Sequence, residues 1–420
     1  MIEKLAINGG KPVRGEPYPP WPYFWEEEKK AVREVLDSGK VNYWTGFRGM
    51  EFQKRWAEYC GVKHAIALNS GTSALHVAVA AAGIGPGDEV ICPSYTFIGT
   101  AAAVLHQNAV PIFVDVDAST YNIDPAAAEK AITPKTKAII AVHLHGHPAE
   151  MDPLLDLART HNIIVIEDAA QAHGAEYRGR KIGSIGHLAA FSFCQDKIIT
   201  TGGEGGMVTT DSDELAEIGR SFKDHGYWEE EHKDLLQMEA LYPYIHHRMG
   251  FNYRMTEMQS VIGMAGLKRL DAWVDRRREN AHYLTERINR IPQLEPPYEA
   301  PHVKHAFYKY AFTIKPETLK CSRDDFIRAL RAEGIPCVAG VPPSNQMEEV
   351  FQKHVGYGDT KCPFACPWYG EPPDYSKMKT PVAEKLGALT IWLLVHPTVE
   401  RKDLDDVATA LEKVAGAYPA

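Results

Sequence analysis

The stretch HAIALNSGTSALHVAVAAAG, residues 64–83, places a short apolar run before a glycine turn and a helix-forming run. HAIAL predicts a buried strand, and TSALHVAVAAAG predicts a helix. The same order recurs to about residue 210, through DEVICPS, VPIFVDVD, KAIIAVHLHG, IIVIEDAA, LAAFSFC and GGMVTT. Apolar strands separated by helices predict an α/β fold with a mostly parallel sheet between helices. GGMVTT is an expected exception, because the connection before it is too short for a helical crossover.

The chain outside this pattern predicts an N-terminal arm and a second, smaller domain. Residues 25–38 predict one helix, and a helical pattern runs from Thr256 to about Arg290. Beyond it, AFYKYAFTI (306–314) predicts a strand, residues 322–334 and 400–414 predict helices, and residues 362–382 predict a loop. We therefore divide the chain into an arm and helix (1–40), a large α/β domain (41–255), and a linking helix with a small α+β domain (256–420).

Composition limits the classes of function. The net charge of −9 leaves no basic excess for binding nucleic acid or an anionic membrane. We expect no membrane span, because no apolar run is long enough, and MIEKLAINGGKPVRGE lacks a signal-peptide core. The seven cysteines are odd in number and scattered, which favours reduced thiols and a cytoplasmic location.

One candidate anion site lies at the turn NSGTSALH, residues 69–76. The backbone N–H groups of Gly71, Thr72 and Ser73 at the start of the predicted helix can hold an anion, helped by the helix dipole. Plain helix capping is an equally good explanation of this turn when it is taken alone. Ser192, near the end of a later strand, could bind the same anion.

Three further residues gain meaning only together. Asp168 ends the apolar run IIVIED, where doubly wound sheets bind ligands, and its carboxylate can hold a protonated ring nitrogen. Lys197 lies between the run LAAFSFC and the glycine-rich TTGGEGG, and a lysine amine can form a Schiff base with an aldehyde. Phe97 could lie against a flat ring. Taken singly, these residues are more simply a turn cap, a solvated charge and a core side chain.

Together, a phosphate cradle, an acid, a stacking ring and a Schiff-base lysine are the parts that pyridoxal phosphate requires. The chain resembles the DegT/DnrJ/StrS family of sugar and cyclitol aminotransferases. The resemblance rests on LAINGGKPVR, NSGTSAL, GDEVICPSYTFIGTA, VPIFVDVD, AVHLHGHPAEMD, EDAAQAHGA, FSFCQDKIITTGGEGGM, GFNYRMTEMQSVIG and TPVAEKLGALTIWL. It implies fold type I, with a mostly parallel seven-stranded-type sheet and a small C-terminal domain.

The resemblance also implies a role for each site residue. Lys197 would bind the cofactor covalently and move the proton, and Asp168 would pair with the ring nitrogen. Gln171 would approach the ring, and Phe97 would stack on it. The residues implied to hold the phosphate are Gly71, Thr72, Ser192 and, from a partner subunit, Asn252. Arg254 is a candidate for the carboxylate of the amino donor. The implied unit is a homodimer with shared active sites.

We therefore expect a pyridoxal-phosphate aminotransferase that moves an amino group from glutamate or glutamine to a keto sugar, nucleotide-linked in most relatives. A scyllo-inosose-type cyclitol aminotransferase, a sugar dehydratase and a non-catalytic cofactor-binding regulator stay as alternatives. The extra glycine of TTGGEGG and the CQD before Lys197 depart from the usual family pattern. His143, His145 and His147 of HLHGH would share one face of a strand, but we favour a strand-end loop over a metal site.

Overall fold

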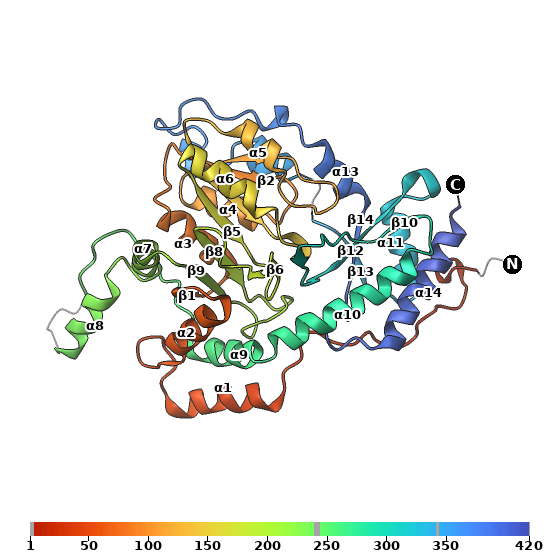
Figure 1. Ribbon diagram of the computed structural model, residues 1–420, viewed down its shortest axis with the longest axis horizontal. Coiled ribbons are helices and arrows are strands. Elements are labelled where there is room, and N and C mark those ends of the chain that lie inside the picture. The colour runs from red at the N-terminus through yellow and green to blue at the C-terminus, as the bar shows by residue number, and fades with distance from the viewer. Residues whose placement is uncertain (1–3, 239–243, 342–343, 420) are drawn as a thin grey trace.

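The computed structural model describes residues 4–238, 244–341 and 344–419. A seven-stranded sheet of order β1-β9-β8-β5-β4-β2-β3 forms its centre (Figure 1). The strands are β1 (His64–Leu68), β2 (Glu89–Pro93), β3 (Val110–Val114), β4 (Thr136–Val142), β5 (Ile164–Asp168), β8 (Leu188–Ser192) and β9 (Gly206–Thr210). The neighbouring pairs β3–β2, β2–β4, β4–β5 and β5–β8 are parallel. Strand β9 is antiparallel to both of its neighbours, β1 and β8. The predicted mostly parallel sheet and its exception at GGMVTT are confirmed.

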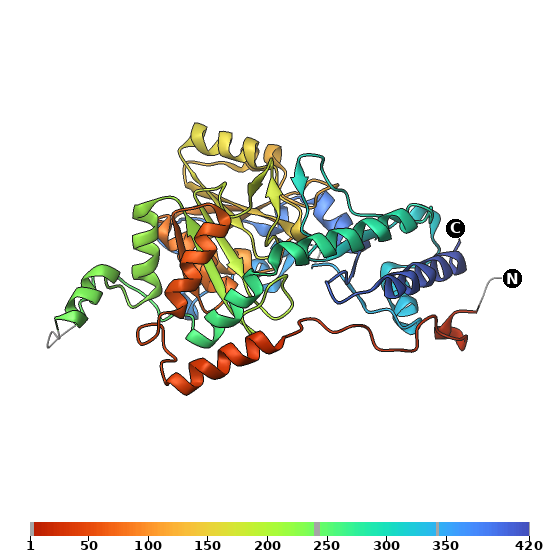
Figure 2. The ribbon, with the colours of Figure 1, turned by 60° about the horizontal axis from the view of Figure 1, so that its bottom comes forward.

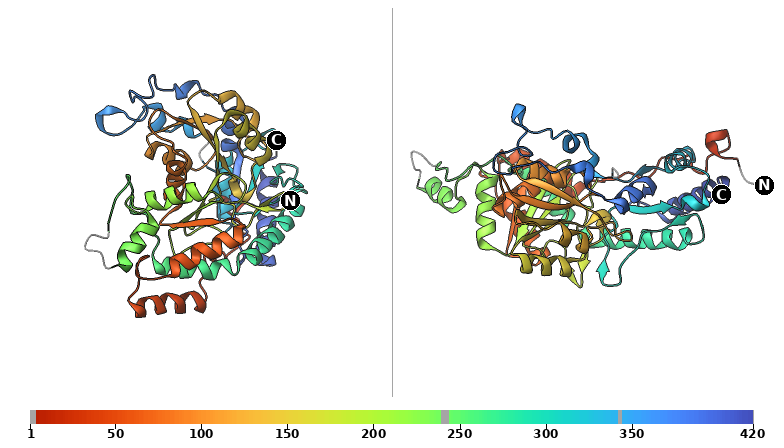
Figure 3. Two further views of the ribbon diagram at one scale, coloured as in Figure 1. Left: turned by 60° about the vertical axis from the view of Figure 1, so that its left-hand side comes forward. Right: turned by 90° about the horizontal axis from the view of Figure 1, so that it is seen from above.

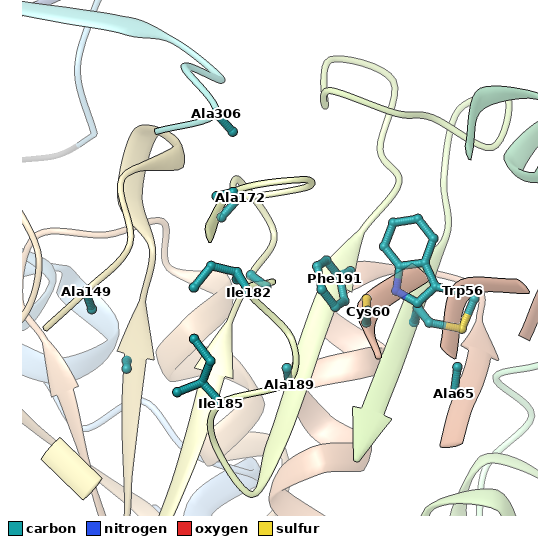
Figure 4. Packing of buried hydrophobic residues seen from close by; sticks show 14 of the residues in the cluster. Trp56, Cys60, Ala65, Ala149, Ala172, Ile182, Ile185, Ala189, Phe191 and Ala306 are labelled. Atoms are coloured by element: carbon teal, nitrogen blue, oxygen red, sulfur yellow. The ribbon is translucent and has the colours of Figure 1, made fainter. Parts of the chain in front are cut away.

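Helices cover both faces of this sheet, because its strands are apolar on both sides. They are α2 (Arg48–Cys60), α3 (Gly71–Ala81), α4 (Gly99–His106), α5 (Pro125–Ala131), α6 (Met151–His161), α7 (Asp213–Lys223) and α9 (Glu257–Leu267). Adjacent residues of β5 belong to different cores: Val165 packs in the cluster with α2, α6 and α9, and Ile166 in the cluster with α3, α4 and α7. Figure 4 shows the first cluster, where the rings of Trp56 and Phe191 meet edge to face with centroids 5.1 Å apart.

The predicted helix from Thr256 to about Arg290 is two helices, α9 and α10 (Leu270–Ile288), interrupted at Lys268 and Arg269. At the interruption the Arg269 side chain turns to α1 (Glu26–Ser38), where it pairs with Glu27 and Glu28. A single helix is therefore the wrong prediction here, because the backbone of Arg269, with φ −108°, departs from the helical value of about −63°. Helix α10 runs from the large sheet to the small domain (Figures 1 and 2).

The small domain is a four-stranded antiparallel sheet of order β10-β12-β14-β13. Its elements are β10 (Leu294–Glu295), α11 (Arg323–Ala332), β12 (Tyr310–Ile314), β13 (Cys337–Ala339), β14 (Thr390–Leu393) and α14 (Arg401–Ala417). The strand predicted over 306–314 starts only at Tyr310. Phe307 has a left-handed backbone (φ 45°), which turns residues 306–309 out of the strand.

Two segments pack against both the large sheet's side of the molecule and the small domain. The N-terminal arm runs under the molecule from the small domain, where Leu5 is buried, to α1 (Figure 2). Val341 and residues 344–386 return to the large sheet, and Val341, Phe351 and Phe364 join its core. The remaining elements are α8 (Glu229–Gln237), α12 (Glu349–Gln352), α13 (Pro381–Leu389), and the short strands β6 (Glu176–Tyr177), β7 (Arg180–Lys181) and β11 (Val303–Lys304). Helix α8 projects at one end (Figure 3). Across the described ranges, no helix has the length and apolarity needed to cross a membrane.

Candidate active site

A cavity of about 450 Å³ opens where the parallel strands end and α3 and α4 begin. This is the edge at which α/β sheets bind ligands. Residues from the loops, helix starts and strand ends of the large domain line most of it, and the C-terminal part of the chain adds Tyr308, Val341 and Trp392. The cavity brings together these predicted site residues: Gly71, Thr72, Phe97, Asp168, Gln171, Ser192 and Lys197.

The start of α3 lies against the end of β8. Ser70 caps the helix by accepting a hydrogen bond from the Ser73 backbone N–H. The N–H groups of Gly71 and Thr72 have no partner within the helix and are available to an anion. A Cβ on Gly71 would lie 2.5 Å from Cβ of Ser192, so only glycine permits this approach. Ser73 itself is buried outside the cavity lining, and its hydroxyl donates to Asn69 Oδ1 over 2.7 Å.

Asp168 presents a buried carboxylate at the end of β5. The hydroxyl of Thr100, on α4, donates to its Oδ2 over 2.8 Å, and the N–H of Ala170 donates to Oδ1 over 3.2 Å. Among the described residues no cation pairs with it within 4.0 Å. Burial raises the pKa of Asp168, against the opposing effect of Thr100. A carboxylate held this way is suited to a cationic hydrogen-bond donor brought in by a ligand.

Lys197 extends toward the same cavity from the turn after β8. Its Nζ donates to the Tyr308 hydroxyl over 3.2 Å and lies 3.7 Å from Oδ1 of Asp196. The Tyr308 hydroxyl in turn donates to Asp196. From the N-terminal arm, Trp21 Nε1 donates to the backbone oxygen of Lys197 over 2.9 Å. The amine is therefore held by Tyr308 of the small domain and by the adjacent Asp196, and the N-terminal arm holds the backbone of Lys197.

Gln171 and Phe97 flank the cavity in different ways. The Gln171 side-chain oxygen accepts the backbone N–H of His145 over 2.8 Å, which fixes the amide beside Asp168. Phe97 is 61% exposed, so its ring is not a core side chain. An exposed ring at the cavity wall is free to stack on a flat ligand.

Two predicted site residues lie away from this cavity. Asn252 is exposed and pairs through its backbone with Asp224. Arg254 forms an ion pair with the same Asp224 and is only 18% exposed. Within one chain, neither contributes to the cavity lining.

The three histidines of HLHGH follow β4 in a tight turn, and all are buried. His143 Nε2 bonds to Glu167 Oε2 over 3.0 Å, and His145 Nε2 accepts from Trp392 Nε1 over 3.0 Å. His147 Nδ1 bonds to the oxygen of Pro148 over 2.7 Å. These rings organise the turn behind Asp168, and nowhere in 4–238, 244–341 or 344–419 do three ligand-type side chains gather as a metal site.

Sequence reasoning missed four residues that shape the cavity. Ser70 lies in NSGTSALH, where its preference for helix N-caps could have indicated it. Thr100 lies in GDEVICPSYTFIGTA, where its spacing of one helical turn from Thr96 could have indicated it. Tyr308 and Trp392 come from the small domain. No local signal identifies them, because only the tertiary fold brings them to Lys197.

Comparison with known proteins places this geometry in context. The model of the DegT/DnrJ/EryC1/StrS aminotransferase family matches residues 22–371. The GDP-perosamine synthase of Caulobacter vibrioides is 41% identical over 92% of this chain and 95% of that protein. A putative L-glutamine:3-amino-2,3-dideoxy-scyllo-inosose aminotransferase of Micromonospora echinospora is 35% identical over 99% and 97%. The crystal structure of an aminotransferase from Psychrobacter cryohalolentis superposes with a TM-score of 0.86 at 39% identity, covering 96% and 99%.

Proposed function

The chain belongs to the DegT/DnrJ/EryC1/StrS aminotransferase family, and from this we propose that it uses pyridoxal phosphate to aminate a keto sugar. The amino donor is glutamate or glutamine. One observation carries the proposal: the Lys197 amine, the Asp168 carboxylate and the N-terminus of α3 line one cavity. The family resemblance and the fold type inferred from the sequence are confirmed by the family match and the structural neighbours.

The residues of the cavity fit pyridoxal phosphate. Asp168 is a buried carboxylate with no cation of the described residues within 4.0 Å, as a partner for a protonated pyridine nitrogen should be. The close approach of Gly71 to Ser192 brings two free helix N–H groups and a hydroxyl together, as a phosphate site requires. Lys197 supplies an amine at the same cavity, and Phe97 supplies an exposed ring.

When bound, pyridoxal phosphate supplies an aldehyde and an electron-withdrawing ring to the amine exchange. The chain supplies the rest. Asp168, oriented by Thr100 and Ala170, would hold the ring nitrogen in its protonated form. The Lys197 amine would move a proton at the reacting carbon of each substrate. Tyr308 accepts a hydrogen bond from that amine and thereby holds it at the cavity.

The acceptor we propose is a nucleotide-linked keto sugar. Support comes from the 41% identity to a GDP-perosamine synthase, against 35% for the putative scyllo-inosose aminotransferase. The cyclitol therefore stays as the second candidate. An amine at Lys197 opposite an intact Asp168 favours amino transfer over the dehydratase and regulator alternatives.

We further propose that the enzyme is a homodimer in which Asn252 completes the partner's phosphate cradle. Apolar side chains close to Asn252 in the sequence support this, since Phe251 is 37% exposed and Met249 is 81% exposed. Exposed apolar groups that gather on one surface commonly mark a protein interface. All seven cysteines are free thiols, which supports the proposed cytoplasmic location.

The experiment is a transfer assay with an ¹⁵N-labelled donor. Purified protein and pyridoxal phosphate are incubated with glutamate or glutamine labelled at the α-amino nitrogen, and with GDP-, UDP- or dTDP-linked keto hexoses or scyllo-inosose. Mass spectrometry then detects ¹⁵N in the product. We expect labelled amino sugar from the wild type and none from Lys197→Ala. Loss of water without gain of nitrogen, or no reaction with any acceptor, would contradict the proposal.

A further inference from the structure

A second cavity, of about 360 Å³, adjoins the Lys197 site. Asp196 and Tyr308 line both cavities, so the two spaces meet at these side chains. The walls of the second cavity include Trp21, Arg277 and His396. Its position is therefore one side chain away from the amine that we propose to carry the chemistry.

Positive charge in this cavity is poorly balanced. Arg277 is 2% exposed, and no carboxylate of the described residues lies within 4.0 Å of its guanidinium. Its Nη1 donates to the backbone oxygens of Phe307 and Tyr308, over 3.4 and 3.2 Å, and its Nε has no partner among the described atoms. Buried charges in proteins are normally paired, because desolvation is costly. An unpaired buried arginine at a cavity wall indicates that the counter-charge arrives with a ligand.

Lys309 adds a second positive charge to this cavity. Its side chain is 12% exposed and faces Asp196 Oδ2 at 3.4 Å, while Oδ1 of the same carboxylate faces Lys197 at 3.7 Å. One carboxylate thus serves two lysines, and Arg277 has none. Burial lowers the pKa of Lys309, and nearby Arg277 and Lys197 lower it further against the opposing effect of Asp196.

The remaining walls suit an oxyanion as well. His396 is buried, and its Nε2 has no partner within the described part of the chain. Trp21 stacks on His396 with ring centroids 5.8 Å apart and also lies 5.2 Å from the Arg277 guanidinium. The N-terminal arm therefore closes one side of a space that holds two cations and a free ring nitrogen.

We propose that Arg277 and Lys309 form an anion subsite that binds an oxyanion of a substrate while its reacting carbon lies at Lys197. This rests on the proposed function. Both substrates carry suitable chemistry: a carboxylate on the amino-acid donor, and a phosphate on a nucleotide-linked acceptor. Arg254, the candidate from the sequence, pairs with Asp224 and does not line either cavity within one chain.

The test is calorimetric titration of the holoenzyme with 2-oxoglutarate, the keto form of the glutamate donor, and separately with UDP. The variants are Lys309→Gln, Lys309→Arg and Arg277→Gln, with Lys320→Gln, an exposed lysine of the same domain, as the matched control. Loss of a charge-assisted hydrogen bond predicts at least about tenfold weaker binding in the Gln variants. Lys309→Arg should recover most of the affinity.

The two ligands separate the sources of the anion. Weaker binding of 2-oxoglutarate alone assigns the subsite to the donor carboxylate, and weaker binding of UDP alone assigns it to the acceptor phosphate. Unchanged affinity for both ligands in Lys309→Gln, or a change no larger than in Lys320→Gln, overturns the proposal. If Arg277→Gln does not fold, Lys309→Gln carries the test alone. A wild type that binds these ligands but transfers no nitrogen would contradict the proposed function and leave the subsite standing.

Discussion

Replacing Gly71 with alanine tests the closeness of α3 to β8, on which the phosphate cradle depends. The added Cβ would lie 2.5 Å from Cβ and 2.9 Å from Oγ of Ser192. Carbon atoms in contact normally lie about 3.5–4.0 Å apart, so the start of the helix must move by roughly 1 Å. Backbone strain is not the obstacle, because Gly71 is the first residue of a helix, where alanine is otherwise favoured.

The size of the effect follows from these opposing terms. Overpacking costs about 1–3 kcal/mol, and the better helix propensity returns up to about 1 kcal/mol. We therefore expect the free energy of unfolding of the cofactor-free protein to fall by about 1–2 kcal/mol. The same shift moves the N–H groups of Gly71 and Thr72 away from a bound phosphate. Affinity for pyridoxal phosphate should fall at least about tenfold, as expected for loss of one charge-assisted hydrogen bond.

The assays are urea unfolding without cofactor and an absorbance titration with pyridoxal phosphate. Gly85→Ala is the matched control, because a Cβ there meets nothing within 4 Å and the backbone is not left-handed. Cofactor affinity in Gly71→Ala within about twofold of the wild type would refute the reasoning. A stability loss equal to that of Gly85→Ala would refute the steric part.

Three further perturbations test the groups behind the cavity. Burial raises the pKa of Asp168, so its ionised form destabilises the cofactor-free fold. Asp168→Asn should unfold at a higher urea concentration than the wild type at pH 7. This difference in stability should shrink as pH falls toward 4. The variant should also bind pyridoxal phosphate about 10- to 100-fold more weakly in the absorbance titration. Burial alone would raise the pKa of Glu167, but His143 and backbone N–H donors outweigh it and lower that pKa. Glu167→Gln should therefore lose about 2–4 kcal/mol of stability at pH 7, measured by urea unfolding. The loss should diminish as pH falls through the lowered pKa, and a loss that does not depend on pH would contradict this reasoning. Tyr308→Phe removes the acceptor for Lys197 and should slow amino transfer about 2- to 10-fold, measured as kcat, with cofactor affinity unchanged.

The large sheet was predictable because its signal is local. The apolar runs of β1 to β4 are each followed by a helical period, and the short connection before GGMVTT rules out a crossover helix. The errors lie where tertiary contacts override the local pattern. The helical period breaks at Lys268 and Arg269, where Arg269 pairs with Glu27 and Glu28 of α1, and Phe307 takes a left-handed backbone that shortens an apparently continuous strand.

The site divides in the same way. Gly71 and Lys197 follow strands of one sheet and Asp168 ends another, so a common edge brings them together, and the sequence order predicts this. Tyr308 and Trp21 reach Lys197 from the small domain and from the N-terminal arm. Their positions depend on how α10 and the arm pack against the large sheet, which no sequence period encodes.

Borohydride reduction of the holoenzyme followed by peptide mapping tests the central claim most directly. Reduction fixes the cofactor on the amine that binds it, and mass spectrometry identifies the modified peptide. We predict one pyridoxyl group per chain on the peptide that contains Lys197, and none in Lys197→Ala. Modification of a different lysine, or of none, would contradict the assignment of this cavity as the catalytic centre.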